Sequence, residues 1–141
     1  MCIRDRVNAF VVIDPDNTVT LRIAKSEMGQ GVLTSLAMIV AEELPCDFKK
    51  VKVEYASANR NLLDGAPYGK MGTGGSSSVR RSREILQQAG ASARVRLIGA
   101  AAARWGVEAS SCVARAGEVL HEATNRKASL PPNTGHCTTA A

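Results

Sequence analysis

Apolar and polar residues alternate in the first third of the chain in the way that is typical of half-buried β-strands. Residues 8–13 and 18–23 are rich in β-branched side chains, and residues 14–17 between them contain the proline, aspartates and asparagine that favour a turn. Residues 51–55 alternate apolar and charged side chains in the same way. The pattern predicts a hairpin, followed after a gap by a third strand.

The apolar spacing changes to a helical period in two longer segments. Residues 32–44 repeat leucine, valine and alanine at intervals of three and four residues, and this run ends at Pro45. Residues 76–105 predict a second and longer helix, which Gly90 and Gly99 weaken enough to bend or divide it.

The remaining segments complete an α+β fold. Residues 57–75 are rich in glycine, asparagine and alanine and predict a long loop, which inside a compact domain is usually functional or disordered. A short hairpin is expected around Ala116 and Gly117. The predicted order is therefore β-β-α-β-loop-α-β-β, a partial binding domain without internal repeats.

Length and composition limit the possible architectures. The chain has 141 residues, which is enough for one domain or for a piece of a larger protein. With 45% hydrophobic residues it can bury a core, but only 4% of its residues are aromatic, so small aliphatic side chains must build that core. No apolar run reaches the roughly 18 residues of a membrane helix. We therefore expect no membrane span.

Neither end of the chain continues the pattern of the middle. Residues 1–7 have a basic pair but no apolar stretch of the kind found in a signal peptide, so we expect a non-native leader. Residues 130–141 form an unpatterned tail, and we assign no chemistry to His136 or Cys137. The predicted domain thus covers residues 8–129, and the localisation stays open.

The net charge of +5 is concentrated in the second predicted helix. Six arginines and one glutamate lie between residues 80 and 104, which leaves the rest of the chain neutral. Such a helix is most often a solvated face, but it also allows a small nucleic-acid-binding module. This alternative lacks the aromatic platforms of single-strand binders and any groove-reading motif. We therefore expect no nucleic-acid partner.

The cysteines and histidines predict no metal site. The four cysteines are scattered without a C-x-x-C pair, and the two histidines stand at no zinc-ligand spacing from them. Cys46 and Cys112 are expected to act as small apolar residues. No iron–sulfur pattern is present.

Two glycine-rich segments each precede a predicted helix, at residues 27–31 and 71–78. A helix start offers unpaired N–H groups and partial positive charge, and glycine lets a ligand approach the backbone. Such a start suits phosphate, and Gln30 adds an amide suited to the edge of a heterocycle. The alternative is a structural domain without ligand, in which the glycines serve turns and the serines cap the helix.

These segments carry a resemblance to a known family. The chain resembles the molybdenum-binding large subunit of the xanthine dehydrogenase/aldehyde oxidase family, and most of all the isoquinoline 1-oxidoreductase beta-subunit type. The resemblance covers residues 8–129 and rests on five runs in order: Ser-Glu-Met-Gly-Gln-Gly-Val at 26–32, Ala-Glu-Glu-Leu at 41–44, Val-x-Val-Glu at 51–54, Gly-Thr-Gly-Gly-Ser-Ser-Ser-Val-Arg at 72–80 and Ala-Ala-Arg-Trp-Gly-Val at 102–107.

The resemblance implies a molybdopterin dinucleotide cofactor with molybdenum, the cytosine form being favoured. One set of residues would line the pterin near the metal, with Gln30 bonding to the cofactor, and a second set would hold the dinucleotide phosphates. The first set is Met28, Gly29, Gln30 and Gly31, and the second is Thr73, Gly74, Gly75, Ser76, Ser77 and Ser78.

The implied reaction is hydroxylation of an aldehyde or an N-heterocycle with oxygen derived from water. By the family pattern, the catalytic base is a glutamate in a Gly-x-Gly-Glu context elsewhere in a longer subunit. Gly117-Glu118 departs from that context and lies in a predicted hairpin turn, so we assign no catalytic residue here. The implied partners are the rest of the large subunit and a small [2Fe-2S] subunit that carries the electrons away.

Overall fold

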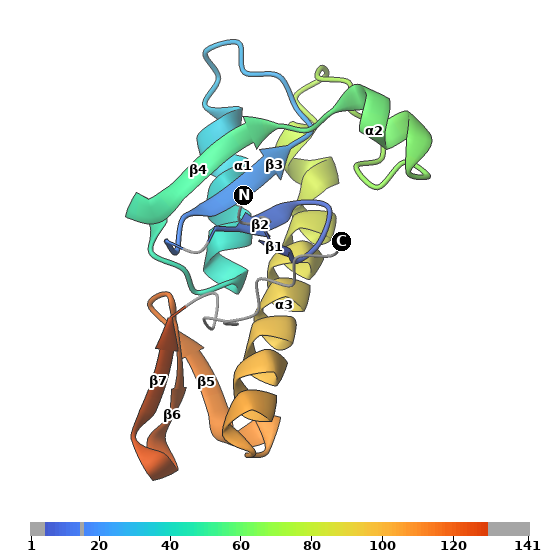
Figure 1. The fold of residues 1–141 in the computed structure, drawn as a ribbon. Coiled ribbons are helices and arrows are strands. Elements are labelled where there is room, and N and C mark those ends of the chain that lie inside the picture. The colour runs from blue at the N-terminus through green and yellow to red at the C-terminus, as the bar shows by residue number, and fades with distance from the viewer. Residues whose placement is uncertain (1–4, 15, 130–141) are drawn as a thin grey trace.

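The computed structural model describes residues 5–14 and 16–129, and it contains two sheets and three α-helices (Figure 1). Residues 1–4 of the predicted leader and the whole predicted tail, with His136 and Cys137, lie outside the described residues. The elements in chain order are β1 Asp5–Arg6, β2 Val11–Ile13, β3 Val19–Ile23, α1 Val32–Glu43, β4 Val51–Tyr55, α2 Ala58–Leu63, α3 Ser78–Trp105, β5 Cys112–Arg115, β6 Glu118–His121 and β7 Arg126–Ser129.

The larger sheet has the order β1-β2-β3-β4, and its last pair of strands is parallel. β1, β2 and β3 are antiparallel neighbours, whereas β3 and β4 pair in register from Val19–Val51 to Ile23–Tyr55. Parallel neighbours need a crossover connection, and α1 provides it. The position of α1 therefore determines where β4 joins the sheet.

α1 and α3 cover one side of this sheet and run in the same direction (Figure 1). The contacts follow that direction: Val40 and Glu43 of α1 lie against Gly90, and Arg94, one turn further along α3, donates to the carbonyl oxygen of Glu43 at 2.9 Å. Both helix starts therefore lie at the same end of the molecule, and the positive ends of their dipoles lie together.

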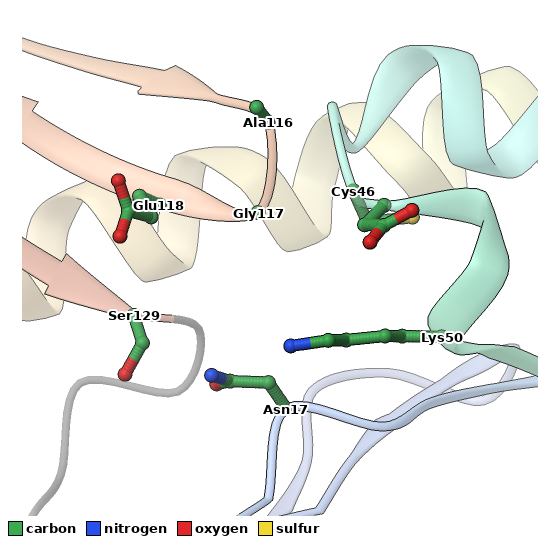
Figure 2. A pocket seen from close by; sticks show the side chains of 8 residues that line it. Asn17, Cys46, Lys50, Ala116, Gly117, Glu118 and Ser129 are labelled. Atoms are coloured by element: carbon green, nitrogen blue, oxygen red, sulfur yellow. The ribbon is translucent and has the colours of Figure 1, made fainter.

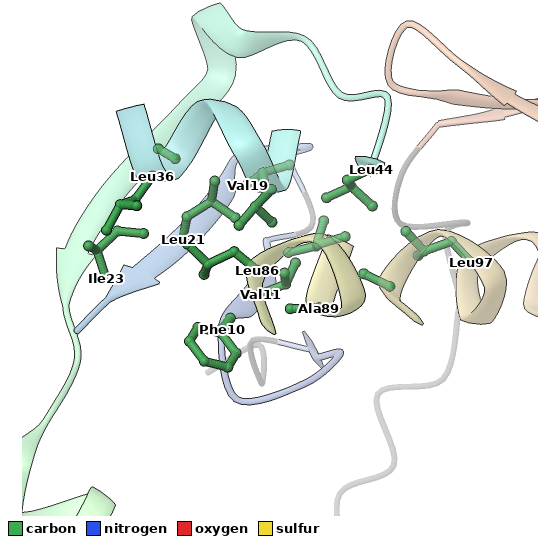
Figure 3. Close-up of a cluster of buried hydrophobic side chains, with 14 of the residues drawn as sticks. Phe10, Val11, Val19, Leu21, Ile23, Leu36, Leu44, Leu86, Ala89 and Leu97 are labelled. Carbon is green, nitrogen blue, oxygen red and sulfur yellow. The ribbon is translucent and has the colours of Figure 1, made fainter. Parts of the chain in front are cut away.

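The core lies between the sheet and these two helices, and most of its large side chains are aliphatic, with Phe10 and Tyr68 as its aromatic members (Figure 3). Leu21 and Ile23 of β3 pack beneath Leu36 of α1, and Leu86 and Leu97 of α3 complete the layer. Alanines fill the remaining positions on both helices, which agrees with the low aromatic content.

Gly90 is the point of closest approach between the two helices. A Cβ atom at this position would lie 2.6 Å from the carbonyl oxygen of Val40 and 2.7 Å from the Cβ atom of Glu43. Gly99 has nothing within 4 Å of the corresponding position. α3 is one helix from Ser78 to Trp105, so the glycines do not divide it. Gly90 instead allows helix contact.

The predicted loop at residues 57–75 contains the short helix α2 and is organised around Asn61. The side chain of Asn61 accepts from the Tyr68 amide at 2.8 Å and donates to the Gly69 carbonyl oxygen at 2.9 Å. The Tyr68 hydroxyl donates to the carbonyl oxygen of Ala9 at 2.9 Å, and its ring meets Phe10 edge to face. These contacts fasten the loop to the main sheet.

The smaller sheet has the order β5-β6-β7 and lies at the far end of α3 (Figure 1). Its hairpin turn touches the end of α1 through a hydrogen bond of 2.8 Å from the Gly117 amide to the Pro45 carbonyl oxygen. The predicted hairpin is therefore present, and β7 adds a third strand to it.

The α+β class is confirmed, while the element order differs from the predicted one. The structure adds β1, α2 and β7, and the first predicted strand is shorter because the side chain of Asn8 accepts from the amides of Phe10 and Val11 and bends the chain there. Asp5 and Arg6 of the predicted leader pair with β2. The leader and domain boundaries themselves stay predictions.

We predict that Gly90→Ala destabilises the fold by about 1–3 kcal/mol, because the added methyl group forces the two helices apart. The matched control is Gly99→Ala in the same helix, which should gain roughly 0.5–1 kcal/mol from helix propensity alone. Urea denaturation followed by circular dichroism measures both free energies of unfolding. Equal effects of the two substitutions would show that the helix contact does not depend on Gly90.

Candidate functional site

The two glycine-rich segments meet in space although they are far apart in the sequence. The amide of Ser26 donates to the hydroxyl oxygen of Thr73 at 2.8 Å, across 47 residues of chain. Next to this bond, the ammonium group of Lys25 donates to the carbonyl oxygens of Lys70 at 2.6 Å and Gly72 at 2.9 Å. The segment after β3 and the segment before α3 therefore form one surface.

In the first segment, residues 26–31, Glu27 accepts hydrogen bonds from two amides of the segment and from one amide in the first turn of α1. The carboxylate of Glu27 accepts from the amides of Leu33 at 3.1 Å, Gly31 at 2.9 Å and Gly29 at 2.8 Å. These amides, with Leu33 first, hold the pKa of the Glu27 carboxyl below its ordinary value of 4.5. The expectation that the start of α1 offers unpaired donors to an anion is therefore wrong for these three groups.

Gln30 is also engaged within this segment. Its amide nitrogen donates to the carbonyl oxygen of Ser26 at 2.8 Å, and its amide oxygen accepts from the Met28 amide. One N–H and one lone pair of the side chain remain for a ligand. Met28 itself is 71% exposed, so the apolar tip of the segment faces outward.

The second segment, residues 71–77, leaves its helix start open. Gly75 and Ser76 take left-handed conformations with φ of 60° and 49°, and the hydroxyl of Ser77 donates back to the Gly74 carbonyl oxygen at 2.9 Å. No side chain of the N-cap residue bonds to the first turn of α3, and that turn contains no acidic residue. Its backbone donors therefore suit an anion.

A hollow of about 630 Å³ lies beside the segment that precedes α3 and the first two turns of that helix. Three of the predicted phosphate-binding residues, Thr73, Gly74 and Ser77, line it. The remaining lining residues are Lys25, Tyr68, Gly69, Lys70, Met71, Gly72, Arg81, Ser82 and Ile85. Gly75, Ser76, Ser78 and the whole predicted pterin set, Met28 to Gly31, lie outside this lining.

Lys25 and Arg81 are the residues of the hollow that the sequence analysis missed as binding residues. Lys25 lies two residues after the end of the buried strand β3, and Arg81 lies one helical turn after Ser77. Their positions in the sequence, next to the two glycine-rich segments, could have identified them as residues near the candidate site. Together they make the hollow electropositive.

The other arginines of α3 do not form one continuous basic face with Arg81. Arg94 bonds to Glu43 of α1, and Arg96 donates to the carbonyl oxygen of Val7. Arg80 and Arg83 are exposed near the helix start. The charge therefore divides between helix packing and the open end of α3.

A second and smaller hollow, of about 140 Å³, lies between the two sheets (Figure 2). Lys50 reaches into it from one side, and Glu118 stands on β6 at the other side (Figure 2). Glu118 is the first residue of β6 and not part of the turn. Opposite charges and backbone surround this space, so it has no preference for an anion.

The described residues contain no group of three or more metal-ligating His, Cys, Asp or Glu side chains. Cys46 and Cys112 are free cysteines, and burial raises the pKa of the Cys46 thiol to about 11. Within the described residues, no helix has the length and apolar character needed to cross a membrane.

A family model described as a molybdopterin cofactor-binding domain matches residues 3–135. The chain belongs to this family. The resemblance to molybdenum-binding large subunits is thereby confirmed. The match includes both glycine-rich segments and the helices that follow them.

Two curated relatives are similar to this molybdopterin-binding chain over most of its length. It is 37% identical over 90 residues to the Membrane-bound aldehyde dehydrogenase (pyrroloquinoline-quinone) of Gluconacetobacter polyoxogenes, a match that covers 64% of the chain and 11% of that relative. It is 36% identical over 97 residues to Isoquinoline 1-oxidoreductase subunit beta of Brevundimonas diminuta, covering 67% of the chain and 12% of that relative. The chain thus spans about an eighth of either relative's length.

A solved structure shares the fold. The crystal structure of the Cu,Mo-CO dehydrogenase in its carbon monoxide-reduced state superposes with a TM-score of 0.57 and 22% sequence identity. The superposition covers 86% of this chain and 15% of that one.

We predict that Glu27→Gln lowers the free energy of unfolding at pH 7, because the charged acceptor of three backbone amides is lost. The carboxylate's contribution is complete above pH 4.5 and disappears as the pH falls through the lower pKa of the folded state. In denaturation experiments, the difference in free energy of unfolding between the wild type and Glu27→Gln should therefore become smaller as the pH falls below 4.5 towards pH 3.

The matched control for this prediction is Glu42→Gln, which removes an exposed carboxylate from the last turn of α1, away from the amides that donate to Glu27. It should leave the pH dependence of stability close to that of the wild type. A gap between the wild type and Glu27→Gln that stays constant from pH 7 to pH 3 would contradict the prediction.

Proposed function

We propose that this chain forms part of the molybdopterin-dinucleotide site of a molybdenum hydroxylase that oxidises aldehydes or N-heterocycles with oxygen derived from water. The observation that carries the proposal is the junction of the two glycine-rich segments beside an electropositive hollow at an open helix start. The family assignment gives the cofactor class, and the names of the two curated relatives contain an aldehyde and an N-heterocycle as substrates of those proteins.

The donors at the start of α3 fit a phosphorylated group. Unpaired backbone N–H groups and the positive end of the helix dipole favour an anion. The hydroxyls of Thr73 and Ser77 and the charges of Lys25 and Arg81 line the same hollow. Gly75, Ser76 and Ser78 supply the turn and the first backbone donors, and a diphosphate linkage matches this set of donors better than an uncharged group would.

The segment at residues 26–31 fits the planar, polar part of the same cofactor. The carboxylate of Glu27 already occupies the amides of Gly29, Gly31 and Leu33, which makes this segment less suited to phosphate than the start of α3. Gln30 still offers one donor and one acceptor, the pairing that the edge of a pterin needs. Met28, Gly29 and Gly31 present exposed backbone and an apolar tip beside it.

The bound cofactor would supply the redox-active metal, while the residues of this chain bind and orient it. We assign no general base and no iron–sulfur ligand to the described residues, so the chain alone is catalytically incomplete. The rest of the large subunit and a [2Fe-2S] subunit would supply these parts. The Brevundimonas relative is named a beta subunit, which supports a multi-subunit enzyme.

The test is to replace the proposed cofactor residues in the complete enzyme and to measure bound molybdenum and pterin. We expect Gln30→Ala to lower both. Ser76–Ser78 changed together to alanine should also lower both, because the Ser77–Gly74 hydrogen bond that shapes the turn is lost together with the hydroxyl groups at the helix start. Ser92→Ala, an exposed serine further along α3, is the matched control.

The nucleotide released by hydrolysis of the cofactor should be cytidine monophosphate. The proposal fails if every variant retains the metal and pterin content of the wild type. The name of the Gluconacetobacter relative includes a quinone, pyrroloquinoline-quinone. If the enzyme contained a quinone in place of a pterin, the proposal would also be overturned.

A further inference from the structure

Lys25 is a buried cation that lies directly beneath the junction of the two segments. Only 8% of its surface is exposed, although lysine is almost never buried to this degree. Its ammonium group donates to the carbonyl oxygens of Lys70 and Gly72, which belong to the segment before α3. Lys25 itself lies in a bend between the end of β3 and the other segment.

This placement is costly for the ammonium group. Burial lowers the pKa of Lys25, and the nearby charge of Arg81 lowers it further. Among the described residues, the contacts recorded for its ammonium group are main-chain carbonyl oxygens and no carboxylate. A buried charge without an ionic partner is unfavourable, and hydrogen bonds to carbonyl oxygens offset part of that cost. Here they fix the path of one backbone segment.

The segment that contains Lys70 and Gly72 depends on contacts of this kind to stay ordered. Residues 65–75 contain five glycines and no regular element, so their backbone loses much conformational entropy when ordered. Asn61 holds the segment near Tyr68 and Gly69, and α3 holds its other end. Between these points, Lys25 and the Ser26–Thr73 hydrogen bond are the contacts that join it to the first segment.

We propose that Lys25 is a positioning residue, which together with the Ser26–Thr73 hydrogen bond forms a loop clamp that holds the two binding segments in one fixed arrangement. The clamp keeps the Thr73 hydroxyl and the start of α3 at a constant distance from Gln30. One cofactor can then contact both segments at once. The link to a cofactor rests on the proposed function, whereas the clamp itself is a property of the ligand-free chain.

The ligand-free test compares Lys25→Met with Lys70→Met. Both substitutions remove one positive charge from the same hollow, but only the first removes the clamp, because Lys70 contributes its backbone carbonyl oxygen. We expect hydrogen exchange at the Ser26 amide to accelerate roughly tenfold or more in Lys25→Met and to change less than about twofold in Lys70→Met. Lys25→Arg, which retains the donors, should restore most of the protection. Equal exchange rates in the two methionine variants would overturn the proposal.

A second measurement keeps the proposal testable if Lys25→Met does not fold. In the ligand-free chain, Thr73→Val removes the other half of the clamp, and Thr73→Ser retains it. Acetic anhydride should acetylate Lys25 at least about fivefold faster in Thr73→Val than in Thr73→Ser, with Lys70 as the internal reference. Identical Lys25 reactivity in these two variants would overturn the clamp.

Pterin content of the complete enzyme separates this proposal from the proposed function. Lys25→Met should lower bound pterin more than Lys70→Met does, and Lys25→Arg should recover it. If Gln30 and serine variants lose pterin but Lys25→Met does not, the clamp is wrong and the proposed function stands. If the clamp variants alter exchange while no variant loses pterin, the proposed function is wrong and the clamp stands.

Discussion

The contact between α1 and α3 at Gly90 is the constraint on which the rest of the structure depends. α1 connects the parallel strands β3 and β4, so its position sets the edge of the larger sheet. α3 carries the smaller sheet at one end and the electropositive hollow at the other. A residue with a Cβ atom at position 90 would meet the Val40 carbonyl oxygen at 2.6 Å, so only glycine lets the helices approach this closely. Their parallel direction then brings both helix starts to one end.

Much of the fold follows from local sequence patterns. The two-residue apolar period of β3 and the helical periods of α1 and α3 mark the faces that pack into the core, although Thr20 on the opposite face of β3 is buried as well. β1 and β7 escaped prediction because two to four mainly polar residues at a sheet edge carry no such period. α2 escaped because none of its residues is buried, and Asn61 determines its surroundings through contacts outside the helix.

The site was less predictable than the fold. The glycine and serine residues before each helix predicted turns with exposed backbone at both segments. The hydrogen bonds of these two segments differ, and the sequence pattern did not predict that difference. The Glu27 carboxylate accepts from backbone amides only two to six residues further along the chain, including the Leu33 amide in the first turn of α1. The sequence pattern gave no reason to expect these hydrogen bonds. The bond between Ser26 and Thr73 spans 47 residues and depends on the helix contact, so local reasoning could not find it. Lys25 was missed because a lysine after a strand normally reaches solvent.

Under the proposed function, these differences would let the two glycine-rich segments serve different parts of one ligand. In the segment at residues 26–31, the carboxylate of Glu27 accepts from nearby backbone amides. The segment presents the amide edge of Gln30 and the exposed side chain of Met28, a surface that suits a polar heterocycle. In the segment before α3, the hydroxyl of Ser77 donates to the Gly74 carbonyl oxygen and does not cap the helix. The backbone donors in the first turn of α3 therefore remain available, which suits phosphate. A ligand that carries both chemical groups gains from both surfaces only when their separation is fixed. The helix contact sets that separation coarsely, and the hydrogen bonds of Lys25 and Ser26 set it at the level of individual atoms.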